Sequence, residues 1–280
     1  MSDDAPSTEP GSSETGTTAA EQREAVRERY AEIVTDSASC CDDEASCGSG
    51  TTDGELDDRS RSMGYSEEAL ESVAAGANLG LGCGNPTAIA SLEAGDAVLD
   101  LGSGAGFDCF LAAREVGPDG RVIGVDMTPE MVETARENAR ENDASNVEFR
   151  LGEIEHLPVA DGSVDVIISN CVVNLSPDKP QVFADAFRVL RPGGRLAISD
   201  VVLTARLPDP VRADPSSVAA CVAGASSIPD LESMLIEAGF EAISIEPKAD
   251  SGSFIREWDD ERDLSEYVVS ATIEARKPVR

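Results

Sequence analysis

The chain has 280 residues, 41% of them hydrophobic, which is enough for one α/β domain with a sizeable core and a smaller appendage. Its 54 Asp and Glu residues outnumber 22 Lys and Arg residues, so the formal net charge is -32. This balance argues against nucleic acid or an anionic membrane as a partner, because no basic patch could neutralise phosphates. Carboxylates spread through the globular part of the sequence instead indicate a halophilic protein. Its salt-adapted surface would stay hydrated at a high cytoplasmic salt concentration.

Residues 1–20 are rich in Ser, Thr, Gly, Asp and Glu and predict a disordered acidic tail. This stretch lacks the apolar segment of a signal peptide, and no run of about 18 apolar residues occurs in the sequence. We therefore expect a soluble, cytoplasmic protein that works as a monomer. The seven cysteines do not suit a secreted disulfide framework, and in a reducing compartment they should be free thiols.

Residues 21–95 predict a helix followed by a cysteine-containing cap of loops. A weak helical pattern covers residues 21–34, and an acidic loop of small residues follows at 40–58. Residues 79–86 are too rich in glycine for a helix and predict a second loop. Cys83 therefore lies in a loop just ahead of the main domain.

Residues 96–205 predict a Rossmann-like α/β fold with a doubly wound, mostly parallel sheet. Short apolar strands alternate there with helical segments, which is the pattern of a parallel sheet covered on both faces. The predicted strands are 97–101, 121–126, 147–151, 164–169 and 195–199, with helices at 107–116, 130–142 and 179–190. Residues 206–280 predict a small C-terminal α+β substrate-binding region, with a helix at 230–238 and strands at 242–246 and 267–275.

A glycine-rich turn follows the first predicted strand. It reads Asp100-Leu-Gly-Ser-Gly-Ala-Gly106, where alternate glycines let the backbone turn tightly and approach a ligand without a Cβ atom in the way. The spacing G-x-G-x-G differs from the G-x-G-x-x-G of dinucleotide-binding proteins. About 20 residues later the second strand ends in Asp126, where an acidic residue accepts hydrogen bonds from both ribose hydroxyls of a cofactor.

Two further segments, Gly152-Glu-Ile-Glu-His-Leu-Pro158 and Val189-Leu-Arg-Pro-Gly-Gly-Arg195, complete a series of four ordered motifs. The sequence between about Ala97 and Val201 thereby resembles class I methyltransferases, and this resemblance implies S-adenosylmethionine as the cofactor. Either Glu153 or Glu155 is expected at the adenine edge, and His156, the only histidine, is expected beside the adenine or on the surface. The cofactor site implied by the resemblance consists of Asp100, Gly102, Ser103, Gly104, Asp126, Met127, Glu153, Ile154 and Asn170.

Three cysteines come from separate segments that this fold brings to one edge of the sheet. Cys171 follows the fourth strand, Cys83 precedes the first, and Cys221 lies in a small-residue stretch that would cover the crevice. We therefore expect three thiols to converge beside the methyl group of the cofactor. Cys109, inside the first helix, is expected to be an ordinary buried residue. A zinc site is disfavoured because no C-x-x-C pair is present.

The motifs around these cysteines are similar to those of arsenite methyltransferases. The matching runs are Leu81-Gly-Cys-Gly-Asn-Pro86, Asp100-Leu-Gly-Ser-Gly-Ala-Gly-Phe-Asp-Cys109, Gly124-Val-Asp-Met127, Ser169-Asn-Cys-Val-Val-Asn-Leu-Ser-Pro-Asp-Lys179 and Cys221-Val-Ala-Gly-Ala225. The resemblance covers about residues 19–275, and its segment around Cys221 is more degenerate than the others. It implies that Cys83, Cys171 and Cys221 bind As(III).

The same resemblance implies a redox role for a further cysteine near the N-terminus. This catalytic residue is Cys41 or its neighbour Cys40, paired with Cys83, and thioredoxin or a small thiol would serve as the reductant that resets the enzyme.

Thiol chemistry supports As(III) as the methyl acceptor. Soft thiolates suit this soft centre. Three of them leave the arsenic lone pair exposed as the nucleophile, so no general base is needed. Methylation of As(III), in the service of arsenic detoxification, is the expected function. One alternative is a methyltransferase that acts on a quinone or another small molecule. Under this alternative, the substitutions Cys171→Ser and Cys221→Ser would leave the activity of the enzyme largely intact. The other is a thiol-based metalloid-binding protein without catalysis, which the complete set of cofactor motifs disfavours.

Overall fold

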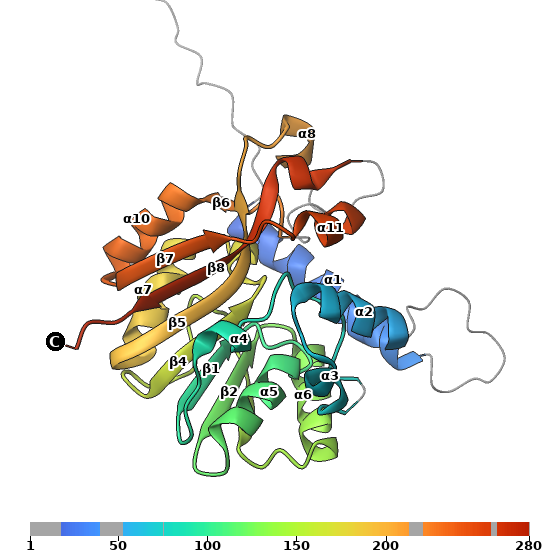
Figure 1. Ribbon diagram of the computed structural model, residues 1–280, viewed down its shortest axis with the longest axis vertical. Coiled ribbons are helices and arrows are strands. Elements are labelled where there is room, and N and C mark those ends of the chain that lie inside the picture. Colours follow the sequence, from blue (N-terminus) through green and yellow to red (C-terminus); the bar gives the residue numbers. More distant parts are fainter. Residues whose placement is uncertain (1–17, 40–52, 75, 213–220, 259–261, 280) are drawn as a thin grey trace, which may run out of the picture.

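The computed structural model describes residues 18–39, 53–74, 76–212, 221–258 and 262–279 (Figure 1). Most of the predicted acidic tail, and both candidates for the redox cysteine, Cys40 and Cys41, lie outside the described residues.

A mostly parallel sheet of eight strands forms the centre of the fold. The strands are β1 (Ala97–Leu101), β2 (Arg121–Asp126), β3 (Val147–Leu151), β4 (Val164–Asn170), β5 (Leu190–Leu203), β6 (Ser226–Ser227), β7 (Glu241–Pro247) and β8 (Val268–Arg276). Their order is β3-β2-β1-β4-β5-β8-β7, and β6 pairs with β5 beside this path. The pairs from β3 to β5 are parallel, whereas β8 is antiparallel to both of its neighbours. This arrangement confirms the predicted doubly wound fold.

Helices cover both faces of the sheet (Figure 1). The α-helices are α1 (Ala19–Ser39), α2 (Asp53–Met63), α3 (Glu67–Glu71), α4 (Thr87–Ala90), α5 (Phe107–Val116), α6 (Pro129–Glu141), α7 (Lys179–Val189), α8 (Asp209–Arg212), α10 (Ile228–Ala238) and α11 (Gly252–Ile255). Short 3-10 helices are η1 (Val173–Leu175), η2 (Arg256–Trp258) and η3 (Leu264–Glu266).

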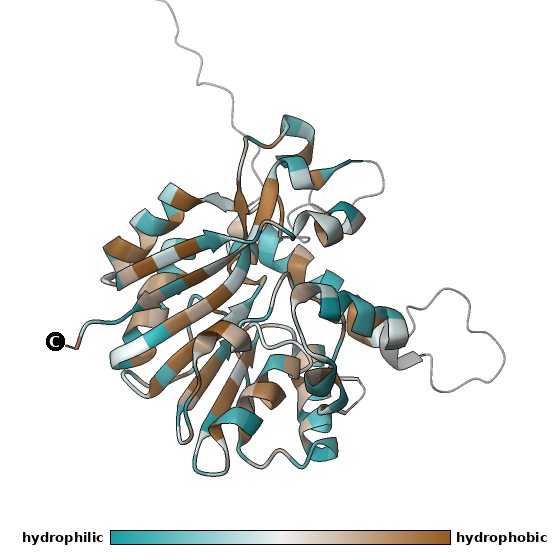
Figure 2. Cartoon of the chain, in the orientation of Figure 1, coloured by the Kyte–Doolittle hydropathy of each residue, from teal (hydrophilic) through white to brown (hydrophobic). Residues whose placement is uncertain are grey.

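Alternate residues of the strands supply two separate cores. In β1, Leu99 and Leu101 pack with side chains of α7 and α10, whereas Val98 packs with α5 and α6 on the opposite face. Figure 2 shows the central strands largely in the hydrophobic colour and the peripheral helix α2 largely in the hydrophilic one. Burial on both faces holds the carboxyl ends of β1, β2 and β4 in fixed positions.

A third core lies at the carboxyl end of the sheet and joins distant parts of the chain. Val26 of α1, Leu207 and Phe254 contribute to it, together with Cys83, Cys171 and Cys221. The strands β7 and β8 from the C-terminal region extend the same sheet, and Val268 of β8 belongs to this core. The three predicted thiols are thus buried inside one cluster.

Two local predictions were wrong. Residues 53–58, predicted as part of an acidic loop, begin α2, which buries Ser60 and Met63 and places Arg61 in its last turn, where a cation suits the helix dipole. The fifth strand was predicted over 195–199 but runs from Leu190 to Leu203, because Leu190 pairs with Val164 of β4 and pairing with β8 continues to Leu203.

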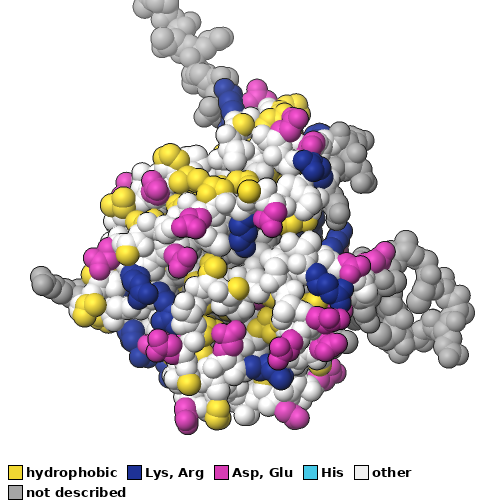
Figure 3. Space-filling model, viewed as in Figure 1, with side chains coloured by type: hydrophobic (Ala, Val, Ile, Leu, Met, Phe, Trp, Pro, Cys, Tyr) yellow, Lys and Arg dark blue, Asp and Glu magenta, His cyan; other side chains and the backbone are white. Residues whose placement is uncertain are grey.

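The charge of the described surface is dispersed. Figure 3 shows Asp and Glu side chains spread over the visible face rather than gathered in one patch. On this face of the described residues, such dispersal is compatible with the predicted salt-adapted surface. In the part of the chain that the structure describes, no helix has the length and apolar character to cross a membrane.

Candidate active site

A cavity open to solvent, with about 1060 Å³ of empty space when the adjoining solvent is included, lies at the carboxyl ends of β1, β2 and β4. This edge is where parallel α/β sheets bind their ligands. Eight of the nine residues predicted to bind the cofactor line this cavity: Asp100, Gly102, Ser103, Gly104, Asp126, Met127, Ile154 and Asn170. The ninth, Glu153, is not among the lining residues, whereas its neighbour Glu155 is.

The glycine-rich turn after β1 leaves one side of the cavity free of side chains. Gly102 has φ of 68°, and a Cβ atom there would lie 2.5 Å from the side chain of Val172. Gly104 has φ of 51°, and a Cβ atom there would meet only the Met131 sulfur, at 3.9 Å. Between them, the hydroxyl oxygen of Ser103 is buried without a hydrogen-bond partner. An orphaned hydroxyl beside an open backbone fits a polar ligand such as the amino-acid part of S-adenosylmethionine.

Asp126 closes the neighbouring side of the cavity at the end of β2. Its carboxylate accepts backbone hydrogen bonds from Gly104 and Thr128, each at 2.9 Å. Burial raises the pKa of Asp126, and these hydrogen bonds oppose the rise. Met127 and Ile154 add apolar surface beside it. A carboxylate next to apolar walls fits a ribose attached to an adenine ring.

A buried polar network lies below the turn. Tyr65 donates a 2.7 Å hydrogen bond to Asp108, and the Cys109 thiol donates one of 3.2 Å to Asp100. Burial raises the pKa of Asp108 to about 6 and raises that of Asp100 well above its usual value. Two buried carboxyls that ionise reluctantly favour a cationic ligand, and S-adenosylmethionine carries an ammonium group. Cys109 is buried, as predicted, and makes this contact in addition.

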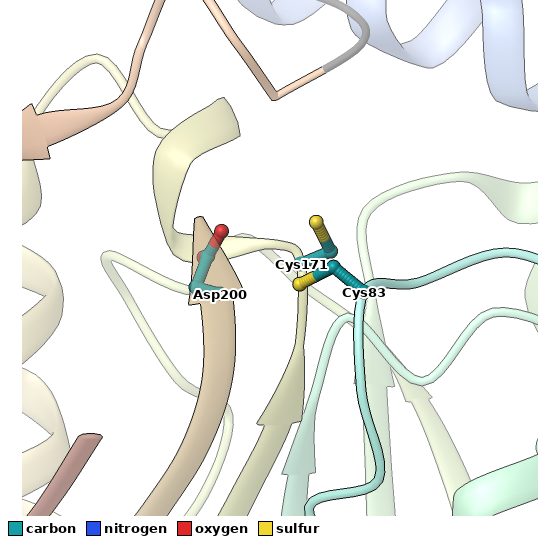
Figure 4. A group of neighbouring side chains, drawn as sticks. All are labelled: Cys83, Cys171 and Asp200. Atoms are coloured by element: carbon teal, nitrogen blue, oxygen red, sulfur yellow. The ribbon is translucent and has the colours of Figure 1, made fainter. Parts of the chain in front are cut away.

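The three predicted thiols meet at the far edge of the cavity. One ligand atom each of Cys83, Cys171 and Asp200 lies within 4.8 Å of the other two (Figure 4). The Cys83 sulfur points from its loop toward the strand ends that carry the other two residues. Cys221 joins them through its thiol, which donates a 2.7 Å hydrogen bond to the backbone carbonyl of Cys171.

Contacts with the other two thiols favour the protonated form of Cys171. Hydrogen bonds with Cys221 and Cys83, together with burial, raise the pKa of Cys171 well above its usual value. Cys171 also lines the cofactor cavity. A soft ligand that takes all three sulfurs would replace these thiol contacts with sulfur–ligand bonds.

The backbone at two of the three cysteines is strained. Cys171 has φ of 59° and Cys221 has φ of 66°, values that side chains other than glycine rarely adopt. Such strain costs about 1–3 kcal/mol per residue and clusters at functional sites. The surrounding contacts must therefore hold these two residues in place.

Those contacts come from asparagines and glycines around the thiols. The Asn170 side chain accepts a 3.0 Å hydrogen bond from the backbone of Cys83 and donates one of 2.7 Å to the carbonyl of Gly84. Near Cys221, a Cβ atom on Gly224 would lie 2.0 Å from the backbone oxygen of Asn174. Both loops are thus packed so closely that their thiols have little freedom to move.

The N-terminal helix α1 covers the cavity. Arg23 reaches Glu155 at 3.2 Å and Glu153 at 3.5 Å, and Val26 and Tyr30 line the cavity one and two turns later. Burial raises the pKa of Tyr30, and the Cys221 and Cys171 thiols raise it further. The helix therefore lies between solvent and the space in which cofactor and thiols meet.

Sequence reasoning missed several residues of this site. Asp200, Tyr65 and Arg23 carry no motif of their own, and Asn174 lies within a matching run in which no role was predicted for it. Asp200 alone had a signal, since it follows an apolar strand as Asp126 does. His156 is exposed, which agrees with its predicted place on the surface.

Known proteins are similar to this chain in sequence. The family model described as "Methyltransferase domain" matches residues 92–239 of this chain. An arsenite methyltransferase of Halobacterium salinarum is 63% identical over 267 residues, which cover 93% of this chain and 68% of that protein. The human arsenite methyltransferase is 41% identical over 152 residues, which cover 51% of this chain and 40% of that protein.

A solved structure is similar as well. The structure of an arsenic(III) S-adenosylmethionine methyltransferase from Chlamydomonas reinhardtii matches with a TM-score of 0.57 and 36% identity, over 79% of this chain and 73% of that one.

The sheet order, the glycine-rich turn and Asp126 define a Rossmann-like methyltransferase, with S-adenosylmethionine as its cofactor. The match to the Halobacterium protein covers most of both chains and therefore identifies the family within this class. The chain belongs to the arsenite methyltransferase family.

Proposed function

We propose that this chain transfers a methyl group from S-adenosylmethionine to As(III) held by Cys83, Cys171 and Cys221. The observation that carries this proposal is the meeting of three buried thiols at the edge of the cofactor cavity. Asp100, Gly102, Ser103, Gly104 and Asp126 are the residues that would hold the cofactor, and residues 206–280 supply Cys221.

The chemistry of arsenic explains why thiols suffice. As(III) forms strong bonds to soft thiolates, and three such bonds leave its lone pair free. The cofactor supplies an electrophilic methyl group when bound. No proton leaves the attacking atom, so the site needs no general base beside the thiols. Holding arsenic in line with the methyl group can supply roughly 7–11 kcal/mol of the barrier.

The rigid surroundings of the thiols serve this alignment. Cys171 and Cys221 occupy strained backbone conformations, and Asn170 binds the Cys83 loop to the end of β4. Helix α1 covers part of the same space, where Val26 is buried and lines the cavity. The chain's own residues would thus position arsenic and limit the access of solvent to the methyl group.

Methyl transfer oxidises arsenic to the pentavalent state, so a reduction has to follow. We propose that Cys41 or Cys40 forms a disulfide with Cys83 and thereby returns two electrons to arsenic. Thioredoxin or a small thiol then reduces the disulfide. These steps require the reducing conditions of a cytoplasm, where we place the protein as a monomer.

The decisive experiment is one incubation. Purified protein is mixed with As(III), S-adenosylmethionine and a thiol reductant at high salt, and the arsenic species are then separated. Methylated arsenic is the expected product. The absence of methylated arsenic, in protein shown to be folded and to bind the cofactor, would contradict the proposal. Cys109→Ser is a control for As(III) binding alone: it removes a buried thiol outside the cluster and should leave As(III) binding intact, but this thiol donates a hydrogen bond to Asp100 in the cofactor site.

A further inference from the structure

The side chain of Asp200 is a buried charge directly beside the thiol cluster. It lies at the carboxyl end of β5 and is only 1% exposed. Its carboxylate lies within 4.8 Å of the sulfurs of Cys83 and Cys171 (Figure 4). Nothing in the three-thiol chemistry requires a carboxylate there, and burying one is costly.

Several donors keep this carboxylate in place. Its Oδ1 accepts hydrogen bonds of 2.8 Å from the side chain of Asn174 and from the backbone of Val201. Its Oδ2 accepts a longer one, 3.3 Å, from the backbone of Asn174. Burial raises the pKa of Asp200 to about 6, against the backbone hydrogen bonds and the charge of Lys179. The three hydrogen bonds fix the orientation of the carboxylate before any ligand binds.

The carboxylate lies outside the cofactor cavity, next to a thiol that lines it. Cys171 lines the cofactor cavity, whereas Asp200 is not among the lining residues although it lies close to the Cys171 sulfur. Arsenic bound to the sulfurs would thus lie close to a carboxylate that the cavity itself does not include. A carboxylate oxygen is a hard ligand, so it competes poorly with three thiolates for As(III) and acts through its charge.

The methyl transfer itself moves positive charge toward Asp200. The arsenic lone pair forms the As–C bond while the carbon–sulfur bond of the donor breaks, and that electron pair remains on the donor sulfur. Arsenic bound to three thiolates is neutral beforehand, and it becomes a four-coordinate cation as it is oxidised from As(III) to As(V). No proton moves in this step.

We propose that Asp200 stabilises the positive charge that develops on arsenic during methyl transfer. The inference rests on the proposed function. A fixed charge that interacts more strongly with the transition state than with the ground state accelerates the reaction without tightening substrate binding. The low dielectric of the buried site strengthens the interaction.

The substitution Asp200→Asn tests this proposal. The new amide oxygen can accept both 2.8 Å hydrogen bonds that converge on Oδ1, so only the charge and the longer contact are lost. Asp165→Asn, at the opposite end of the adjacent strand β4, is the matched control. In single turnovers with preloaded As(III), the rate of methyl transfer should fall about 100-fold in Asp200→Asn alone.

As(III) binding in the absence of cofactor, measured by ultrafiltration, distinguishes the loss of the Asp200 charge from structural damage to the thiol site. Asp200→Asn should bind As(III) as tightly as the wild type, and Asp200→Glu, which keeps the charge, should transfer methyl groups faster than Asp200→Asn. Parallel losses of binding and transfer in Asp200→Asn, an unchanged transfer rate, or a slower Glu variant would each overturn the proposal. If the wild type itself forms no methylated arsenic, the proposed function has failed instead.

Discussion

The thiol of Cys221 donates a 2.7 Å hydrogen bond to the backbone carbonyl of Cys171, although the two residues lie 50 positions apart in the sequence. One follows β4, and the other lies in the segment leading to β6. Both have a positive φ angle. This contact connects a residue that lines the cofactor cavity to the segment that leads to β6, so the proposed arsenic site and the cavity share one structural support.

Replacing Cys221 by serine tests whether the sulfur atom is needed as an arsenic ligand or only for its hydrogen bond to Cys171. The hydroxyl of Cys221→Ser can still donate to the Cys171 carbonyl, but oxygen is a poor ligand for As(III). Misplaced arsenic should slow methyl transfer by about 100-fold or more. Arsenic speciation after timed incubations measures this loss. If Cys221→Ser retains wild-type rates, the acceptor does not bind to this thiol, and the alternative of a carbon or oxygen acceptor gains support.

Gly224→Ala tests the packing behind Cys221. A Cβ atom there would lie 2.0 Å from the backbone oxygen of Asn174, so the segment has to move away. We expect a loss of about 1–3 kcal/mol in unfolding free energy together with weaker As(III) binding. Thermal unfolding and arsenic ultrafiltration check the two effects. Gly54→Ala, where a Cβ atom would meet nothing within 4 Å, should show neither.

Asp126→Asn should affect the cofactor and leave arsenic binding unchanged. The carboxylate accepts hydrogen bonds from Gly104 and Thr128 and faces the cavity. Loss of charged hydrogen bonds to ribose should weaken S-adenosylmethionine binding by about 10- to 100-fold. Isothermal titration with cofactor measures this change, and As(III) ultrafiltration is its control. Unchanged cofactor affinity would place the ribose elsewhere.

The carboxyl of Asp108 should make stability depend on pH. Burial raises its pKa from 3.8 to about 6, so between these values the folded protein keeps a proton that the unfolded chain has lost. The contribution to stability is complete below about pH 4 and is lost as the pH rises through 6, by about 3 kcal/mol in total. Denaturant unfolding at both ends of this window compares wild type with Asp108→Asn, in which this component should vanish. Equal pH dependence in the two proteins would contradict the assignment.

Arg23→Ala should loosen the helix that covers the cavity. The guanidinium bridges Glu155 and Glu153. Because the ion pair with Glu155 is largely buried, we expect its loss to cost about 1–3 kcal/mol, which corresponds to roughly 10- to 100-fold faster cofactor dissociation. Stopped-flow displacement of cofactor measures the rate. Arg27→Ala, an exposed change on the same helix, should leave this rate unaltered.

Local sequence patterns determined much of this protein. β1, β2 and β3 have the bounds predicted for them, because apolar strands between glycine-rich turns and amphipathic helices are recognisable over short stretches. The cofactor residues from Asp100 to Asp126 follow from spacing within a single β-α-β unit. Cys171 also follows from its strand, since the carboxyl ends of parallel strands face one crevice.

Only the tertiary structure decided which distant side chains meet. Arg23 pairs with Glu155 across 132 positions, and the Ser270 hydroxyl binds the Cys83 carbonyl across 187. Such contacts depend on strand order and on how α1 packs, which no local pattern encodes. For the same reason, the sequence named three thiols as the arsenic site, and the fold placed a fourth group, Asp200, beside them.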